Sequence, residues 1–138
     1  MKCQISVNNS EIVKGISQLA KKILIVDDQA GIRLLLQELF KRENYETSTA
    51  ENGLQALQLV EVERPDCVLL DMKMPGVSGI DVLKELKEKW PNLPVIMMTA
   101  YDDVALTSQA MEIGAMKYFT KPFDIFELRD AVHQLFEK

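Results

Sequence analysis

The segment Val68–Gly76 reads Val-Leu-Leu-Asp-Met-Lys-Met-Pro-Gly, and its apolar run ends abruptly at the carboxylate of Asp71. The absence of a polar residue from Cys67 to Leu70 predicts a β-strand buried on both faces, as in a parallel sheet. Such a strand delivers Asp71 to the carboxyl edge of the sheet, where open α/β sheets bind their ligands. An aspartate before a Pro-Gly turn is also common without any function, so this segment alone leaves both interpretations open.

The composition fits one globular domain with a substantial core, because the 138 residues are 47% hydrophobic and 27% charged. The formal net charge is -5 and the sequence has no basic run, so we expect no nucleic-acid partner. No apolar run approaches the roughly 20 residues of a membrane span, and the N-terminus lacks the apolar core of a signal peptide. Two cysteines without a pattern predict neither a disulfide framework nor a zinc site, which favours a cytoplasmic location.

Strand-like and helix-like segments alternate five times from Lys21 onward, without an internal repeat or a linker. The expected strands are the short runs at residues 23–26, 45–49, 67–70, 95–98 and 118–120, and the expected helices carry apolar stripes around Leu36, Ala56, Leu83, residues 103–113 and Val132. This alternation predicts an α/β domain over residues 21–138 with a doubly wound (βα)5 flavodoxin-like fold, in which a central five-stranded parallel sheet has helices on both faces. Residues 1–20 do not match the pattern, and we expect a flexible N-terminal extension there.

Polar residues end four of these strands, and parallel strands bring such ends to one rim. The residues are Asp27, Asp28, Asp71, Thr99 and Lys121. Three neighbouring carboxylates repel one another, and a divalent cation relieves that repulsion. All-oxygen ligands favour a hard ion such as Mg2+. An aspartate beside Mg2+, a lysine and a threonine is equipped to attack a phosphoryl group, while the cations neutralise charge on the phosphoryl oxygens.

Each of these residues also has a simple structural explanation. Asp27 and Asp28 could cap a helix, Thr99 could belong to a turn, and Lys121 could be a solvated lysine. We favour a site because all of these explanations have to hold together, at successive strand ends.

Four segments resemble the motifs of bacterial response-regulator receiver domains. They are Asp27-Asp28, Leu69–Gly76, Met98–Ala100 and Lys121–Phe123. The resemblance covers the chain from about Lys22 to its end, and it is strongest to the single-domain regulators of sporulation phosphorelays. It implies that Asp71 accepts the phosphoryl group, and that Asp27, Asp28, Asp71 and the main-chain carbonyl of Lys73 hold Mg2+.

The same resemblance implies a conformational switch. Thr99 is expected to move toward the phosphoryl group, and Tyr118 matches the aromatic residue that responds to this movement. Lys121 is expected to pair with the phosphoryl group, and the Lys121-Pro122 peptide bond is expected to be cis.

The first helix carries more apolar residues than a core stripe requires. Ile32 and Leu35 lie at the edge of that stripe, near the predicted site. Together with Gln29, Pro122 and Phe123 they are expected to dock a partner helix that presents a histidine. The alternative is that the apolar side chains of this set are all buried.

The last predicted helix ends close to Lys138, so we expect no output domain after it. The first hypothesis is a phosphorelay intermediate, controlling sporulation, that takes a phosphoryl group from a sensor histidine kinase and passes it to a histidine phosphotransferase. An aspartyl-phosphate phosphatase is a further expected partner, and we expect a monomer without membrane contact. His133 lies off the last apolar stripe and is expected to be a solvated surface residue.

The alternative is a stand-alone chemotaxis-type regulator whose phosphorylated form docks on a target protein. Two other functions are disfavoured by the sequence. An aspartate-based phosphohydrolase requires a second aspartate two residues after its nucleophile, and Lys73 at that position argues against it. A receiver-like module that is never phosphorylated would tolerate loss of the acids, the threonine or the lysine, and all of them are present here.

Overall fold

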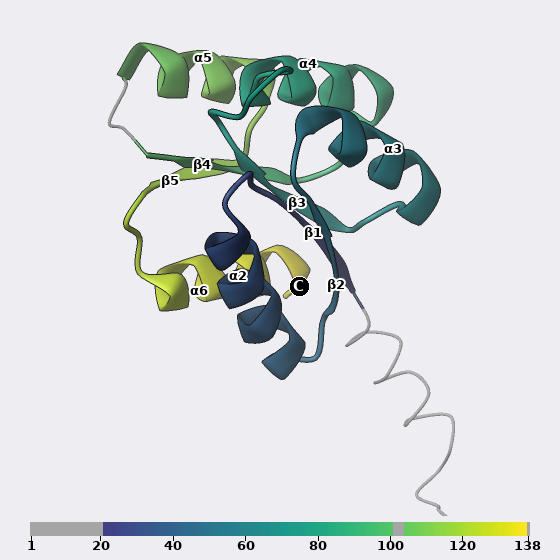
Figure 1. Ribbon diagram of the computed structural model, residues 1–138, viewed down its shortest axis with the longest axis vertical. Helices are drawn as coiled ribbons and strands as arrows, with labels where there is room; N and C mark the ends of the chain where they lie inside the picture. Colours follow the sequence, from purple (N-terminus) through teal and green to yellow (C-terminus); the bar gives the residue numbers. More distant parts are fainter. Residues whose placement is uncertain (1–20, 101–103, 138) are drawn as a thin grey trace, which may run out of the picture.

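The structure is a computed structural model, and it describes residues 21–100 and 104–137 (Figure 1). The extension expected at residues 1–20 and the start of the helix expected near residue 103 lie outside the described residues. The strands are β1 (Lys22–Val26), β2 (Glu46–Ala50), β3 (Cys67–Asp71), β4 (Val95–Thr99) and β5 (Lys117–Thr120). The helices are α2 (Ala30–Arg42), α3 (Gly53–Glu63), α4 (Gly79–Lys89), α5 (Val104–Ile113) and α6 (Ile125–Phe136).

In the described part of the chain the strands form one parallel sheet in the order β2-β1-β3-β4-β5. Helices α2 and α6 cover one face of the sheet, and α3, α4 and α5 cover the other (Figure 1). The predicted doubly wound fold with a central five-stranded parallel sheet is therefore confirmed. Within the described residues, no helix combines the length and apolar character that a membrane span requires.

The inner strands β1, β3 and β4 each supply two separate cores, because successive side chains of a strand point to opposite faces. In β1, Leu24 and Val26 pack under α3, α4 and α5, whereas Ile23 and Ile25 pack under α2 and α6. β3 lies in the middle of the sheet, between β1 and β4, and all five of its residues are buried. This confirms the prediction of a strand buried on both faces that ends in a carboxylate.

Side chains cap three of the helices at their N-termini. Asn52 accepts a hydrogen bond at the start of α3, Ser78 at the start of α4 and Asp124 at the start of α6. In α2 the N-cap residue is Gln29, whose side chain instead binds Lys121. The N-cap of α2 is therefore joined to the loop after β5, at the rim where the strands end.

His133 is not the solvated surface histidine that the sequence suggested, because both of its ring nitrogens have partners. Tyr45 Oη lies 2.7 Å from Nδ1 of His133, and Glu43 Oε1 lies 2.9 Å from Nε2. Burial, followed by the charge of Glu43, raises the pKa of Tyr45 to about 12, so the phenol keeps its proton at neutral pH. The partners lie 88 and 90 residues away in sequence, which is why the local pattern could not reveal them. The network joins α6 to the segment between α2 and β2.

Candidate functional site

Three carboxylates meet at the carboxyl edge of the sheet. Asp27 and Asp28 follow β1, and Asp71 is the last residue of β3. One oxygen from each of the three lies within 4.8 Å of the others. Asp27 and Asp71 are buried, whereas Asp28 is exposed. The predicted convergence of these residues is thus present in the structure, and it leaves two acids with little access to water.

Lys121 brings a positive charge into this group from the loop after β5. Its Nζ lies 2.7 Å from Oδ2 of Asp27 and 3.6 Å from Oδ1 of Asp71, and it donates a hydrogen bond of 3.2 Å to Oε1 of Gln29. The Lys121 side chain is only 13% exposed, so it is not a solvated lysine. The Lys121-Pro122 bond is cis, as expected, and the backbone N–H of Lys121 donates to the carbonyl of Thr99.

Asp71 binds its proton more tightly than an ordinary aspartate. Burial and then the charge of Asp27 raise the pKa of Asp71 to about 6, against the opposing effects of Lys121 and of a hydrogen bond from the backbone of Lys73. One ammonium therefore does not balance the carboxylates that surround it. The negative charge that remains is what a bound cation or a cationic partner would neutralise.

The three carboxylates fit Mg2+, because hard cations prefer oxygen ligands and Mg2+ needs only a few from the protein. Asp27 and Asp71 offer buried oxygens, and exposed Asp28 leaves one side of the group open to water. Asp27 and Asp28 do not act as the helix caps of the alternative explanation. Asp27 Oδ1 accepts a hydrogen bond of 2.9 Å from the backbone of Gln29, and α2 starts only after that residue.

Arg33 is a residue of the site that the sequence reasoning missed. Its Nη1 donates a hydrogen bond of 2.8 Å to the main-chain carbonyl of Asp27. The backbone N–H of Asp27 in turn donates to the carbonyl of Ala50. Together these bonds fix the backbone that carries the first two carboxylates. A signal was available, since an arginine in the first turn of a helix opposes the helix dipole and needs another reason to be there.

The two expected switch residues lie on neighbouring strands. Thr99 is the last residue of β4 and is fully buried. Tyr118 is 41% exposed on β5, where it pairs with Met97, two residues before Thr99. The threonine thus reaches the acidic rim, while the tyrosine ring lies partly in solvent.

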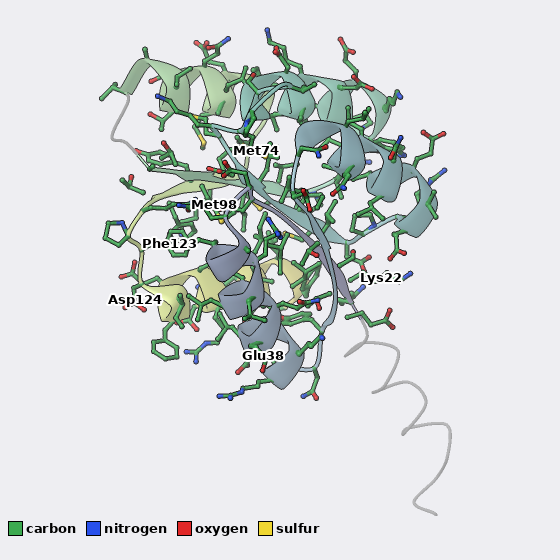
Figure 2. All side chains as sticks on the ribbon, viewed as in Figure 1. Lys22, Glu38, Met74, Met98, Phe123 and Asp124 are labelled. Carbon is green, nitrogen blue, oxygen red and sulfur yellow. The ribbon has the colours of Figure 1, made fainter. Side chains whose placement is uncertain are left out.

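The five residues expected to dock a partner line one hollow of about 400 Å3 beside Lys121. They are Gln29, Ile32, Leu35, Pro122 and Phe123. Leu35 is 44% exposed, whereas its neighbour Leu36 is fully buried. The alternative in which all of the apolar side chains are buried is therefore wrong for Leu35. Figure 2 shows Phe123 between β5 and α6, at the end of the sheet opposite Lys22.

The chain belongs to the family of response regulator receiver domains, whose model matches residues 23–133. Proteins of this family accept a phosphoryl group on an aspartate and bind Mg2+ at an acidic pocket. In the described part of this chain, three aspartates cluster at the ends of β1 and β3.

Similar proteins include Sporulation initiation phosphotransferase F of Bacillus subtilis, which is 57% identical over 112 residues, 81% of this chain and 90% of that protein. Regulatory protein AtoC of Escherichia coli is 44% identical over 78% of this chain, which corresponds to 23% of that longer protein. Among solved structures, a CheY-like receiver domain protein from Methanospirillum hungatei superposes with a TM-score of 0.82 at 27% identity, covering 85% of this chain and 94% of that one.

Proposed function

We propose that this receiver domain is a phosphorelay intermediate that accepts a phosphoryl group on Asp71 from a sensor histidine kinase and passes it to a histidine phosphotransferase. The observation that carries the proposal is the position of Asp71, a buried carboxylate 3.6 Å from Lys121, which itself lines an apolar hollow. The similarity to Sporulation initiation phosphotransferase F over 90% of that protein supports a role in sporulation.

The chemistry is a transfer between two side chains. A carboxylate oxygen of Asp71 attacks the phosphorus of a phosphohistidine, so that an O–P bond forms while the P–N bond breaks and the imidazole leaves with the electron pair. Transfer to the acceptor is the reverse, with a neutral imidazole as the nucleophile. Lys121 stabilises the charge on the phosphoryl oxygens, and it lies close enough to Asp71 to do so.

Mg2+ adds positive charge at the same oxygens when it is bound. Asp27, Asp28, Asp71 and the main-chain carbonyl of Lys73 would hold it. Lys73 follows Asp71 by two residues, and its backbone already contacts the Asp71 carboxylate, which places its peptide group near the carboxylates.

Thr99 and Tyr118 would transmit the conformational change caused by phosphorylation to the surface of the protein. The Thr99 hydroxyl moves toward a phosphoryl oxygen, and this movement makes room for the exposed Tyr118 ring to turn inward. α5 follows β4 and buries only Thr107 and Ala110, so it is the helix that shifts most easily.

The hollow beside Lys121 would dock the helix that presents the histidine. Leu35 and Phe123 provide apolar contacts there, while Gln29 and Lys121 face the charged group. We further propose that residues 21–138 form the receiver domain, that it works as a cytoplasmic monomer, and that an aspartyl-phosphate phosphatase removes the phosphoryl group.

The test begins with a radiolabelled, autophosphorylated histidine kinase, incubated with the full chain with and without Mg2+. The wild type is expected to take up the label only with Mg2+, and Asp71→Asn is expected to take up none, because an amide is not a nucleophile here. Asp130→Asn, an exposed carboxylate of α6, is the matched control and should be labelled normally. Label must then move to a purified histidine phosphotransferase.

Two results would overturn this proposal. Stable labelling of Asp71→Asn would place the phosphoryl group elsewhere. Labelling of the wild type without onward transfer to a phosphotransferase would favour a regulator that acts by docking.

A further inference from the structure

The first turn of α4 lies directly on the end of β3, with no side chain between the two backbones. Gly79, the first residue of α4, is buried, and its N–H donates a hydrogen bond of 3.0 Å to the carbonyl of Met72. A Cβ at position 79 would lie 2.3 Å from the carbonyl oxygen of Asp71 and 2.7 Å from Cα of Met72. These are backbone atoms, which cannot turn away as the end of a flexible side chain could. A side chain at position 79 must therefore displace either the helix or the strand.

Neither element can move easily. On the strand side, the N–H of Met72 donates a hydrogen bond of 2.7 Å to the carbonyl of Met98, and β3 is held between two other strands. On the helix side, α4 buries Val82, Leu83 and Leu86 in the core. Because both sides are packed, we expect the displacement to be shared and to reach Asp71, whose carbonyl makes the shortest of these contacts.

Backbone freedom does not explain this glycine. Gly76, three residues earlier, has φ of +82°, a left-handed conformation that favours glycine, and within the described residues a Cβ there would meet nothing within 4 Å. Gly79 is different, since it lies in a right-handed helix, where glycine is less favourable than alanine by up to about 1 kcal/mol. Gly76 is thus explained by its backbone conformation, whereas Gly79 is explained by the lack of space for a side chain.

We propose that Gly79 is a positioning residue for phosphoryl transfer, because its missing side chain lets α4 hold the backbone of Asp71 where the carboxylate can react. The inference rests on the proposed function of Asp71 as the phosphoryl acceptor. A displacement of about 1 Å at a reacting group can cost about 10²-fold in rate, so a small shift of this backbone matters.

The test compares Gly79→Ala with Gly31→Ala as a matched control. Gly31 lies in the first turn of α2, near the same rim, and among the described residues a Cβ there would meet nothing within 4 Å. Both substitutions make the same chemical change at the start of a helix. Only the one at position 79 should move Asp71.

Three quantities are measured on each full-length protein. They are the backbone amide chemical shifts of residues 71 and 72 without metal, the dissociation constant for Mg2+, and the rate of phosphorylation by acetyl phosphate at saturating Mg2+. For Gly79→Ala we expect displaced amide shifts, weaker Mg2+ binding and a rate lower by about 10- to 100-fold. Gly31→Ala should match the wild type in all three.

A folded Gly79→Ala protein with wild-type Mg2+ binding and phosphorylation would overturn the inference, even if it were less stable, because the glycine would then serve packing alone. If Gly79→Ala does not fold, the same measurements on Ser78→Ala test the inference instead. It removes the side chain that caps α4 through the N–H of Asp81, and so loosens the same turn without adding atoms. Weaker Mg2+ binding and slower phosphorylation of Ser78→Ala would support the inference, and unchanged values would overturn it.

The two proposals can fail separately in this experiment. If the wild type carries no phosphoryl group on Asp71, the proposed function is wrong. If the wild type is phosphorylated there and Gly79→Ala reacts equally fast, only the positioning role is wrong.

Discussion

The Nζ of Lys121 lies 2.7 Å from Oδ2 of Asp27, although 94 residues separate the two in sequence. The same ammonium lies 3.6 Å from Oδ1 of Asp71, so it bridges two buried carboxylates that end neighbouring strands. Lys121 thus contacts two of the three clustered carboxylates, and their combined negative charge exceeds the charge of its ammonium. The consequences for stability, metal binding and partner recognition can each be measured.

Replacing Lys121 by methionine should destabilise the metal-free protein. Asp27 and Asp71 would lose the cation between them, and breaking a buried ion pair by removing one partner costs about 3–5 kcal/mol. We expect the free energy of unfolding in urea at pH 7.5 to fall by about 3 kcal/mol, with part of the loss recovered in Mg2+. Lys89→Met is the control, because the pair of Lys89 with Glu85 is exposed and should contribute under about 1 kcal/mol. Equal losses in the two variants would contradict the role given to Lys121.

Asp71→Asn should stabilise the metal-free protein at neutral pH. The folded-state pKa of Asp71 is about 6 and its ordinary value is 3.8, so the folded protein holds this proton more tightly than the unfolded chain. The wild type therefore loses stability as the pH rises from about 4 to about 6, by up to about 3 kcal/mol. Urea unfolding should show the variant more stable at pH 7.5 and the difference closing below about pH 4. A pH-independent difference would show that ionisation of Asp71 is not its cause.

Mg2+ binding should weaken as the pH falls through the pKa of Asp71. The ion needs the ionised carboxylate, and below about pH 6 it must displace a proton. For one displaced proton, the apparent dissociation constant should rise about tenfold per pH unit below 6. Titration calorimetry from pH 5 to 8 measures this. Asp71→Asn should bind weakly with little pH dependence over that range, and a wild-type affinity that stays flat from pH 5 to 7 would count against Asp71 as a ligand.

Truncating a side chain that lines the hollow beside Lys121 should slow phosphotransfer. The loss in the free energy of unfolding should be smaller than for a buried core residue. Leu35→Ala removes a side chain that is 44% exposed, and we expect a stability loss below about 1 kcal/mol with slower transfer both from the kinase and to the phosphotransferase. Ile32→Ala and Phe123→Ala should slow transfer in the same way. Leu36→Ala, one residue along and fully buried, is the matched control, with a stability loss of about 2–5 kcal/mol. If Leu35→Ala transfers the phosphoryl group at the normal rate, the hollow is not part of the docking surface.

The network around His133 should contribute to stability and leave the acidic rim unaffected. Tyr45→Phe removes one hydrogen bond to Nδ1 and should lower the free energy of unfolding by about 1 kcal/mol. His133→Ala should cost more, since it also leaves Glu43 without this partner. The double variant should lose less than the sum of the single losses, because both changes break the same bond. Additive losses, or a changed Mg2+ affinity, would show that the two residues do not act as one unit.

Residue patterns along the chain predicted the strands, the helices and the polar residues at the rim of the sheet. Periodicities of 2 and 3.6 residues follow from backbone geometry, and the ends of the strands were predicted to within one residue. β2 is an example, expected at residues 45–49 and found at Glu46–Ala50. The convergence of Asp27 and Asp71 followed as well, because all strands of a parallel sheet point the same way.

Which side chains meet across the elements depends on how the elements pack in three dimensions. Leu35 and Leu36 have the same side chain and adjacent positions, yet one is exposed in the hollow and the other is buried. The sequence patterns did not single out Gly79, where the backbones of α4 and β3 approach each other closely. Such contacts depend on the distances between packed elements, which a local pattern of residue types does not specify.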